Sequence, residues 1–176
     1  VLDDRLERFG AEQGLAGDDV FDVCQDREGV TWVGTGRGLV RLANGHASPV
    51  DLGREVGEDA VHVVFVDGSG SLFLGLERRG VARVREGRVE LFGKADGFPG
   101  SQVIDIAEDA KGNVTAFSYD AQDRLSAKTF PDGGTISYSY DAAGNLAQVL
   151  DQNGSVITRS YDAIGRPVRT EVTRGE

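Results

Sequence analysis

The chain has 176 residues, a formal net charge of −10 and one cysteine, and this length suits one ordinary domain or several short repeats that share a core. A single cysteine, Cys24, excludes an internal disulfide and a cysteine-based metal cluster, and the negative field disfavours nucleic acid as a partner. No apolar stretch approaches the roughly 18 residues of a membrane span, so membrane insertion is not expected. The 25 glycines beside four prolines predict an all-β protein of short strands and tight turns.

The first predicted element is a strand over residues 2–9. Its sequence RLERFG at residues 5–10 returns as RVELFG at residues 88–93. The later copy closes a repeated unit, so residues 2–9 are interpreted as the outermost strand of a preceding unit. Because the chain also starts at Val1 and contains no methionine, we expect it to be an internal piece of a longer polypeptide.

Two units of roughly 42 residues follow. Residues 14–45 read as a turn, a strand, the turn DREG, the strand TWVGT, a glycine-bounded turn, the strand LVRL and another turn, and residues 57–87 repeat this layout. A fourth strand, clearest at residues 88–93, ends the unit. Four short strands joined by hairpin turns predict an antiparallel meander of the β-propeller blade type.

Each unit repeats an aspartate three positions before a glycine. The aspartate can accept backbone N–H groups within the hairpin turn, and the glycine supplies the positive φ that such turns require. These pairs are Asp26 and Gly29, Asp67 and Gly70, and Asp109 and Gly112. Trp32 and Phe73 are predicted to fill the space between neighbouring blades, and Gly34 and Gly75 to let the sheets approach closely.

After Gly112 the period falls to half of its former length. Each of the shorter units alternates polar and apolar residues between two turns and predicts one β-hairpin, with a type I turn followed by a bulge. The positions that mark this period are Tyr119, Asp120, Tyr140, Asp141, Gly144, Tyr161, Asp162 and Gly165.

The two periods are commensurate, because two hairpins have the length of one blade. Strands over 102–109, 113–119, 124–130 and 134–140 are therefore predicted to complete a third meander, and residues 145–173 a partial fourth blade. The competing geometry is one continuous twisted sheet that leaves the blades after Gly112. The predicted division is 1–111 for a partial propeller and 112–176 for the hairpins. The predicted fold is all-β, with a propeller that is open and incomplete rather than closed.

The pattern DxxGxxWxGT followed by GL, from Asp26 to Leu39, resembles the two-component regulator propeller repeat over about residues 9–113. The second unit departs from it with Phe73 for Trp and Leu76 for Thr. This resemblance implies extracytoplasmic sensor propellers, some of which recognise oligosaccharides.

Residues 112–173 resemble the YD repeats of the RHS family, with YDAAGNL at 140–146 carrying nearly the whole signature. The departures are Asp123 where glycine is usual and Pro167 where leucine is usual, and Pro167 predicts an edge or irregular strand. This resemblance implies long sheets that form shells, or extracellular stalks that contact partners and sugars.

Catalysis, a metal site and a cofactor are not expected. His46 is predicted in a turn and His62 in a strand without a matching ligand pattern, Ser101 lacks a nucleophile context, and the DREG and DGSG turns lack the ligand count of a calcium loop. A ligand surface, if present, is expected on the loops between blade strands, with a salt-bridged rim as the alternative. Its candidate residues are Arg37, Glu77, Arg78, Arg79, Asp59 and Gln102.

Three functional hypotheses follow. The first is a non-catalytic scaffold or interaction module from a larger RHS-like surface or secreted protein, with flanking repeats of the same polypeptide or another protein as partners. The second is an oligosaccharide-sensing propeller fragment. The third is a gene fragment or fusion with no activity of its own. Family resemblance predicts an extracytoplasmic location, and truncated sheets predict self-association through their edges.

Overall fold

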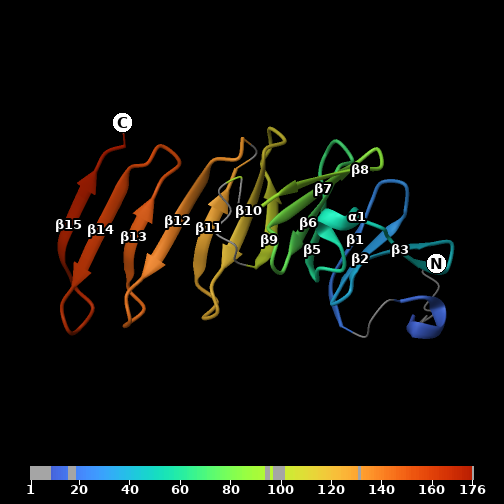
Figure 1. Cartoon of the computed structure of the whole chain (residues 1–176), viewed down its shortest axis with the longest axis horizontal. Coiled ribbons are helices and arrows are strands. Elements are labelled where there is room, and N and C mark those ends of the chain that lie inside the picture. The colour runs from blue at the N-terminus through green and yellow to red at the C-terminus, as the bar shows by residue number, and fades with distance from the viewer. Residues whose placement is uncertain (1–8, 16–18, 94–95, 97–101, 131, 176) are drawn as a thin grey trace, which may run out of the picture.

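The structure is a computed structural model that describes residues 9–15, 19–93, 96, 102–130 and 132–175. It is all-β, with three antiparallel sheets of four, four and seven strands, none of them closed, so the predicted fold class is confirmed. The sheets follow one another along the molecule from the N-terminal to the C-terminal end (Figure 1). The predicted strand over residues 2–9 lies, except for Phe9, outside the described residues.

The first two sheets are the predicted four-stranded meanders. The first has the order β1 (Val20–Gln25), β2 (Thr31–Thr35), β3 (Gly38–Ala43) and β4 (His46–Pro49). The second has the order β5 (Val61–Val66), β6 (Leu72–Leu76), β7 (Val81–Arg85) and β8 (Arg88–Phe92). His46 begins β4 and pairs with Ala43, so its predicted place in a turn is wrong.

Two short helical segments were not predicted. The 3-10 turn η1 (Ala11–Gln13) precedes β1, and the helix α1 (Gly53–Val56) joins the first sheet to the second. Both are too short to show helical periodicity in the sequence. Leu52 and Val56 are buried in the core between the first two sheets, which is why this connection turns inward.

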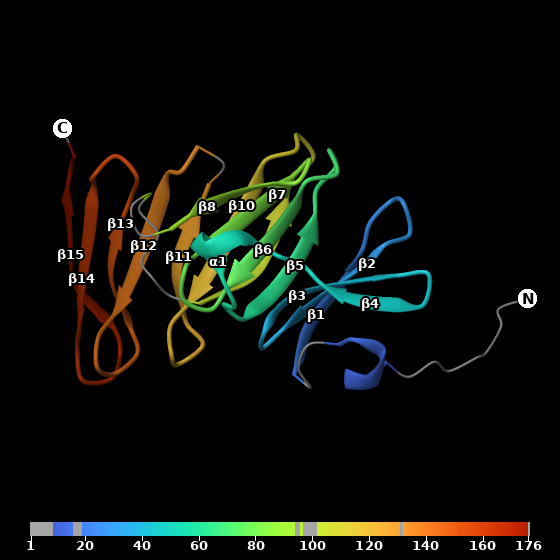
Figure 2. The same cartoon turned by 45° about the vertical axis from the view of Figure 1, so that its right-hand side comes forward.

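The third sheet contains every strand after the second blade. Its order is β15 (Pro167–Thr173), β14 (Val156–Tyr161), β13 (Leu146–Leu150), β12 (Thr135–Tyr140), β11 (Leu125–Thr129), β10 (Val114–Tyr119) and β9 (Val103–Glu108). Consecutive strands pair as antiparallel neighbours from β9 to β15, and both views show them side by side toward the C-terminus (Figures 1 and 2). The predicted partial fourth blade is therefore wrong, and the strands assigned to it extend the third sheet.

Neighbouring sheets pack as blades do, through glycines on the second strand. A Cβ on Gly34 would lie 2.6 Å from the carbonyl oxygen of Val61, and a Cβ on Gly75 would lie 2.6 Å from that of Val103. Trp32 packs against the cluster between the first two sheets, and Phe73 belongs to the cluster between the second and third. These glycines and aromatic residues therefore lie where neighbouring sheets meet.

The same position explains why no further blade stacks on the third sheet. The residue that corresponds to Gly34 and Gly75 is Phe117, which pairs with Asp105 on β9 and carries Lys128 over its ring, with Nζ 5.6 Å from the centroid. A phenylalanine ring fills the volume that the inner strand of another blade occupies at the two glycines. The meander therefore continues sideways by hydrogen bonding and does not stack.

Candidate functional site

The residues predicted to bind a ligand lie on loops and turns that precede or join blade strands. Arg37 is exposed in the turn between β2 and β3, and Glu77, Arg78 and Arg79 are exposed between β6 and β7. Gln102 precedes β9, and its carbonyl accepts the backbone N–H of Tyr119 at 3.2 Å. Arg37 precedes Gly38, whose Cβ position lies 3.9 Å from the carbonyl oxygen of Asp59, and the ligand surface over these six residues stays a prediction.

Asp59 is the centre of the part that does come together. Its side chain is fully buried, with Arg78 Nε 3.2 Å from Oδ1 and Arg79 Nε 3.8 Å from Oδ2. The backbone N–H of Arg78 also donates to Oδ2 at 3.3 Å. A buried carboxylate requires such compensation, so this group fixes the β6–β7 turn. The outer surfaces of both guanidiniums remain exposed, and the ligand role of this rim stays a prediction.

His62 lies beside this cluster and stacks on Phe21 with ring centroids 4.3 Å apart. Its Nε2 atom is buried and has no hydrogen-bond partner among the described residues. Burial lowers the pKa of His62, and the nearby carboxylates of Glu77 and Asp59 oppose this shift without reversing it. The ring is therefore neutral near pH 7, which fits a packed aromatic contact between the first two sheets.

A pocket of about 140 Å³ lies between the outer strands of the second sheet and the β10–β11 hairpin. Phe73, Phe92 and Phe130 supply aromatic walls, and Arg83 contributes a guanidinium. Arg83 Nη2 contacts Glu90 at 2.5 Å, while its Nε is buried without a hydrogen-bond partner in the described part of the chain. Sequence reasoning missed this pocket, because its lining residues come from strands that are distant in the sequence.

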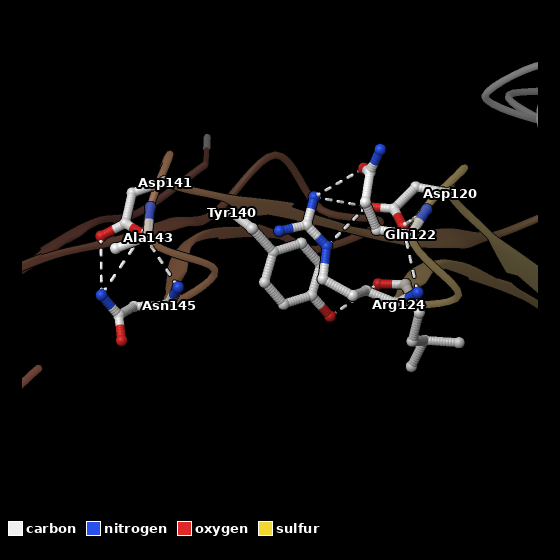
Figure 3. Close-up of polar contacts among 8 residues, drawn as sticks. Asp120, Gln122, Arg124, Tyr140, Asp141, Ala143 and Asn145 are labelled. Carbon is white, nitrogen blue, oxygen red and sulfur yellow. Dashed lines mark hydrogen bonds and ion pairs between the residues drawn. The ribbon is translucent and has the colours of Figure 1, made fainter.

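The seven-stranded sheet is crossed by tyrosines that bond to the preceding repeat. Tyr140 donates its hydroxyl to the carbonyl oxygen of Leu125, and Tyr161 donates to that of Leu146, both at 2.9 Å. Arg124 lies over the Tyr140 ring, with Cζ 4.4 Å from the centroid (Figure 3). We call this bond, from a tyrosine hydroxyl to the leucine carbonyl that opens the preceding hairpin, the tyrosine clamp.

The aspartate that follows each clamp tyrosine organises a hairpin turn. Asp141 Oδ1 accepts the backbone N–H groups of Ala143 and Asn145 at 3.0 and 2.9 Å, and Gly144 takes a φ of 88°. Figure 3 shows this turn beside the turn of Asp120. The hydrogen bond from the Asn145 side chain is the main cause that lowers the pKa of Asp141, followed by bonds from backbone N–H groups.

The blade turns use the same arrangement. Asp26 Oδ1 accepts the backbone N–H groups of Glu28 and Val30 at 3.0 and 2.9 Å, and its Oδ2 accepts Trp32 Nε1 at 2.9 Å. Asp67 and Asp109 accept the corresponding N–H groups of their own turns. All three aspartates thus accept backbone N–H groups within their own hairpin turns.

Among the described residues, no group of three or more His, Cys, Asp or Glu side chains is placed to hold a metal ion. The helices described for this chain are also too short and polar to cross a membrane. Ser101 lies outside the described residues. The described residues form hairpin turns, interfaces between packed sheets and exposed sheet surfaces.

Comparison with protein families identifies both repeat systems. The RHS repeat model matches residues 102–135, 119–151 and 140–176, and the two-component regulator propeller model matches residues 14–37. The predicted resemblance to these two families is therefore confirmed, and the second blade, which departs from the propeller pattern at Phe73 and Leu76, lies outside both sets of matched residues. No curated protein matches the chain.

Solved structures share the fold at low sequence identity. Two crystal structures of an extracellular domain from B. thetaiotaomicron, described as part of a one-component or a hybrid two-component system, match with TM-scores of 0.58 and 0.57 at 16% identity. Each match covers 85% of this chain and 22% of the other, so the chain spans less than a quarter of these relatives. A further extracellular domain of a hybrid two-component system from the same organism matches at 18% identity and a TM-score of 0.49, over 91% of this chain and 23% of the other.

Proposed function

From a chain in which a two-component regulator propeller repeat leads into three RHS repeats, we propose a non-catalytic scaffold that couples propeller blades to an RHS-type sheet. The observation that carries this proposal is the double role of β9. Val103 packs under Gly75 as the inner strand of a blade does, while β9 pairs with β10 as the first strand of the seven-stranded sheet. Strand β9 therefore connects the two repeat systems, because it packs against the second sheet and pairs within the third.

The outward face of the first sheet supports a flanking blade as a partner. Val20 and Val23 are 45% and 55% exposed, whereas the corresponding Val61 and Val64 are 0% and 4% exposed beneath the first sheet. The third copy of this pair, Val103 and Ile106, is buried in the same way beneath the second sheet. Val20 and Val23 thus occupy positions that are buried between sheets in the other two copies. A preceding blade packed on the first sheet would bury them in the same way.

The proposal includes an extracytoplasmic location. It is supported by the propeller-type fold shared with extracellular domains of bacterial sensor systems and by the two repeat families. Secretion of the complete polypeptide, measured by protease accessibility on intact cells, tests it. Protection from protease in intact cells together with cleavage after lysis would contradict it.

Two spectroscopic probes test the coupling. Trp32 is the single tryptophan and lies in the first sheet, while all four tyrosines lie between residues 119 and 161 in the third. If the scaffold is one mechanical unit, urea unfolding followed by Trp32 fluorescence and by tyrosine near-ultraviolet circular dichroism has one midpoint. Two separated midpoints would contradict the scaffold, and absence of a cooperative transition would favour a fragment without function of its own.

Saccharide sensing remains a second candidate because the pocket between the second sheet and the β10–β11 hairpin, which we call the junction pocket, combines aromatic walls with a guanidinium. A glycan array on the purified chain tests it, and Arg83→Ala and Arg78→Ala variants distinguish the pocket from the predicted loop surface. Binding lost only in Arg83→Ala would place the saccharide in the pocket. Failure to bind any glycan would remove the sensing hypothesis and leave the scaffold unaffected.

A further inference from the structure

We propose that Asn44 is a site of spontaneous covalent modification, at which the backbone nitrogen of Gly45 attacks the side-chain amide and closes a succinimide. This property goes beyond the scaffold function and does not depend on it. The chain has four asparagines, and two of them, Asn44 and Asn153, precede a glycine. Glycine has no side chain to hinder attack by its own nitrogen, so these two positions are the candidates.

The other two asparagines are held by the aspartates of their turns. Nδ2 of Asn113 donates to Asp109 Oδ2 at 2.8 Å, and Nδ2 of Asn145 donates to Asp141 Oδ2 at 3.0 Å. Each is also followed by a residue with a branched aliphatic side chain, which crowds the attacking nitrogen. The reactive pairs are therefore the two in which asparagine precedes glycine.

Asn44 and Gly45 form the two-residue loop between β3 and β4. Ala43 pairs with His46 across this loop, and Asn44 and Gly45 take φ values of 51° and 76°, as a type I′ turn requires. Both residues are exposed, and a Cβ at Gly45 would meet nothing within 4 Å. Among the described residues, no hydrogen bond engages the Gly45 N–H or the Asn44 side chain. Both reacting groups are thus free and accessible.

Asn153 and Gly154 place the same dipeptide in a different turn. The N–H of Gly154 donates to the carbonyl oxygen of Asp151 at 3.1 Å, and the N–H of Asn153 donates to Asp151 Oδ1 at 2.9 Å. A Cβ at Gly175 would lie against the carbonyl oxygen of Asn153, so Gly175 packs on this turn. The Gly154 nitrogen can attack only after these contacts open, and this pair is therefore an internal reference for Asn44.

The reaction requires only the chain and water. The Gly45 nitrogen forms a bond to Asn44 Cγ and loses its proton, the bond from Cγ to Nδ2 breaks, and Nδ2 leaves with that proton as ammonia. Water then adds to one of the two ring carbonyl carbons and opens the ring. Opening at the side-chain carbonyl gives aspartate, and opening at the backbone carbonyl gives isoaspartate, in which the main chain runs through Cβ and Cγ.

The isoaspartate product changes the hairpin. It adds one atom to the backbone of a two-residue loop, and the length of such a loop fixes the register of the strands that it joins. Strand β4 pairs with β3 alone, so no other strand holds its register. Amides of β4 should therefore exchange with deuterium faster in the modified chain, while those of β5–β8 keep their protection.

Incubation of the folded chain in isotopically labelled water at mildly alkaline pH tests the proposal, because ring opening places one labelled oxygen at the modified residue. Peptide mapping by mass spectrometry locates the label and separates aspartate from isoaspartate. We expect Asn44 to react faster than Asn153 by roughly 2- to 12-fold, the factor given by the net strength of one hydrogen bond that must break before attack. In urea, where both turns are lost, the two rates should converge.

Variants separate the turn geometry from the local sequence. Asn44→Gln, whose amide would have to close a larger ring, should remove the label at position 44 and leave the rate at Asn153 unchanged. Asp151→Ala removes the oxygen that accepts the N–H groups of Asn153 and Ser155, so it should accelerate the reaction at Asn153 in the folded chain. The matched control is Asp141→Ala, which opens a different turn and should not change that rate.

The proposal is overturned if the folded chain gains no label at Asn44, or if Asn153 reacts as fast as Asn44 in the folded state. A ratio of rates that is the same with and without urea would also overturn it, because the difference would then come from the neighbouring residues and not from the turns.

Discussion

At the scale of single residues, both repeat systems depend on the same turn. An aspartate accepts the N–H groups of the second and fourth residues after it, and the residue between those two takes a positive φ. Hydrogen bonds from N–H groups stabilise the charged form of a carboxyl group, so folding lowers the pKa of Asp141 and Asp162. These aspartates stabilise the fold above their unfolded pKa, and this contribution is lost as the pH falls through the folded pKa.

An Asp141→Asn variant tests this linkage, because the amide keeps an acceptor oxygen but cannot ionise. We expect the original chain to melt at a higher temperature than the variant at pH 7, and the difference to shrink below about pH 4, the ordinary range of an aspartate. Thermal unfolding monitored between pH 7 and pH 3 measures it. A difference that stays constant over this range would contradict the assigned charge effect.

Asp123 is the one non-glycine residue at the positive-φ position of the three Tyr-Asp turns, with a φ of 57°. A side chain in this region of φ strains the backbone, so Asp123→Gly should stabilise the protein by about 0.5–1 kcal/mol. Urea unfolding measures this gain. The reverse change Gly144→Asp, at a φ of 88°, is the matched control and should destabilise.

At the scale of elements, a meander is extended in one of two ways. Either another sheet packs on its face, or another strand pairs with its last strand. Glycine at Gly34 and Gly75 permits stacking, while Phe117 prevents it and β12 pairs onward with β13. The tyrosine clamp then joins hairpins within the sheet, which stacked blades do not require. At this position the two sheets that stack carry glycine, and the sheet that continues by strand pairing carries Phe117.

Gly75→Val tests this control. The added side chain would meet the carbonyl oxygen of Val103, 2.6 Å from the Cβ position, and overpacking of this kind costs roughly 1–3 kcal/mol. We expect the tyrosine transition to shift to lower urea and to separate from that of Trp32. The control is Ala121→Val, which adds a larger side chain in an exposed turn. A glycine such as Gly87 is unsuitable as a control, because its positive φ would add backbone strain. Coincident transitions in Gly75→Val would contradict a packed junction.

At the scale of the whole molecule, the chain is a row of sheets with two open ends of different chemistry. The N-terminal end presents the apolar blade face of Val20 and Val23, and the C-terminal end presents the edge of β15. Val61→Ala should cost roughly 2 kcal/mol, because it removes buried methyl groups between two sheets. Val20→Ala, at the corresponding position of the open face, should change the free energy of unfolding by less than about 0.5 kcal/mol. Equal costs in urea unfolding would show that the first face is already covered.

The sequence by itself determined the strands and the turns of both repeat systems, because aspartate, glycine and alternating residues act through local hydrogen bonds and backbone geometry. Only the tertiary structure determined which strands pair with one another and which distant residues come into contact. A four-stranded blade and two successive hairpins have the same strand pattern, so the third sheet could be identified as continuous only from the pairing of β12 with β13. Likewise, the buried Asp59 ion pairs, the junction pocket and the tyrosine clamp join residues that are distant in the chain. These features depend on how the sheets pack and pair, as at Gly75, where the close approach of Val103 leaves no room for a side chain.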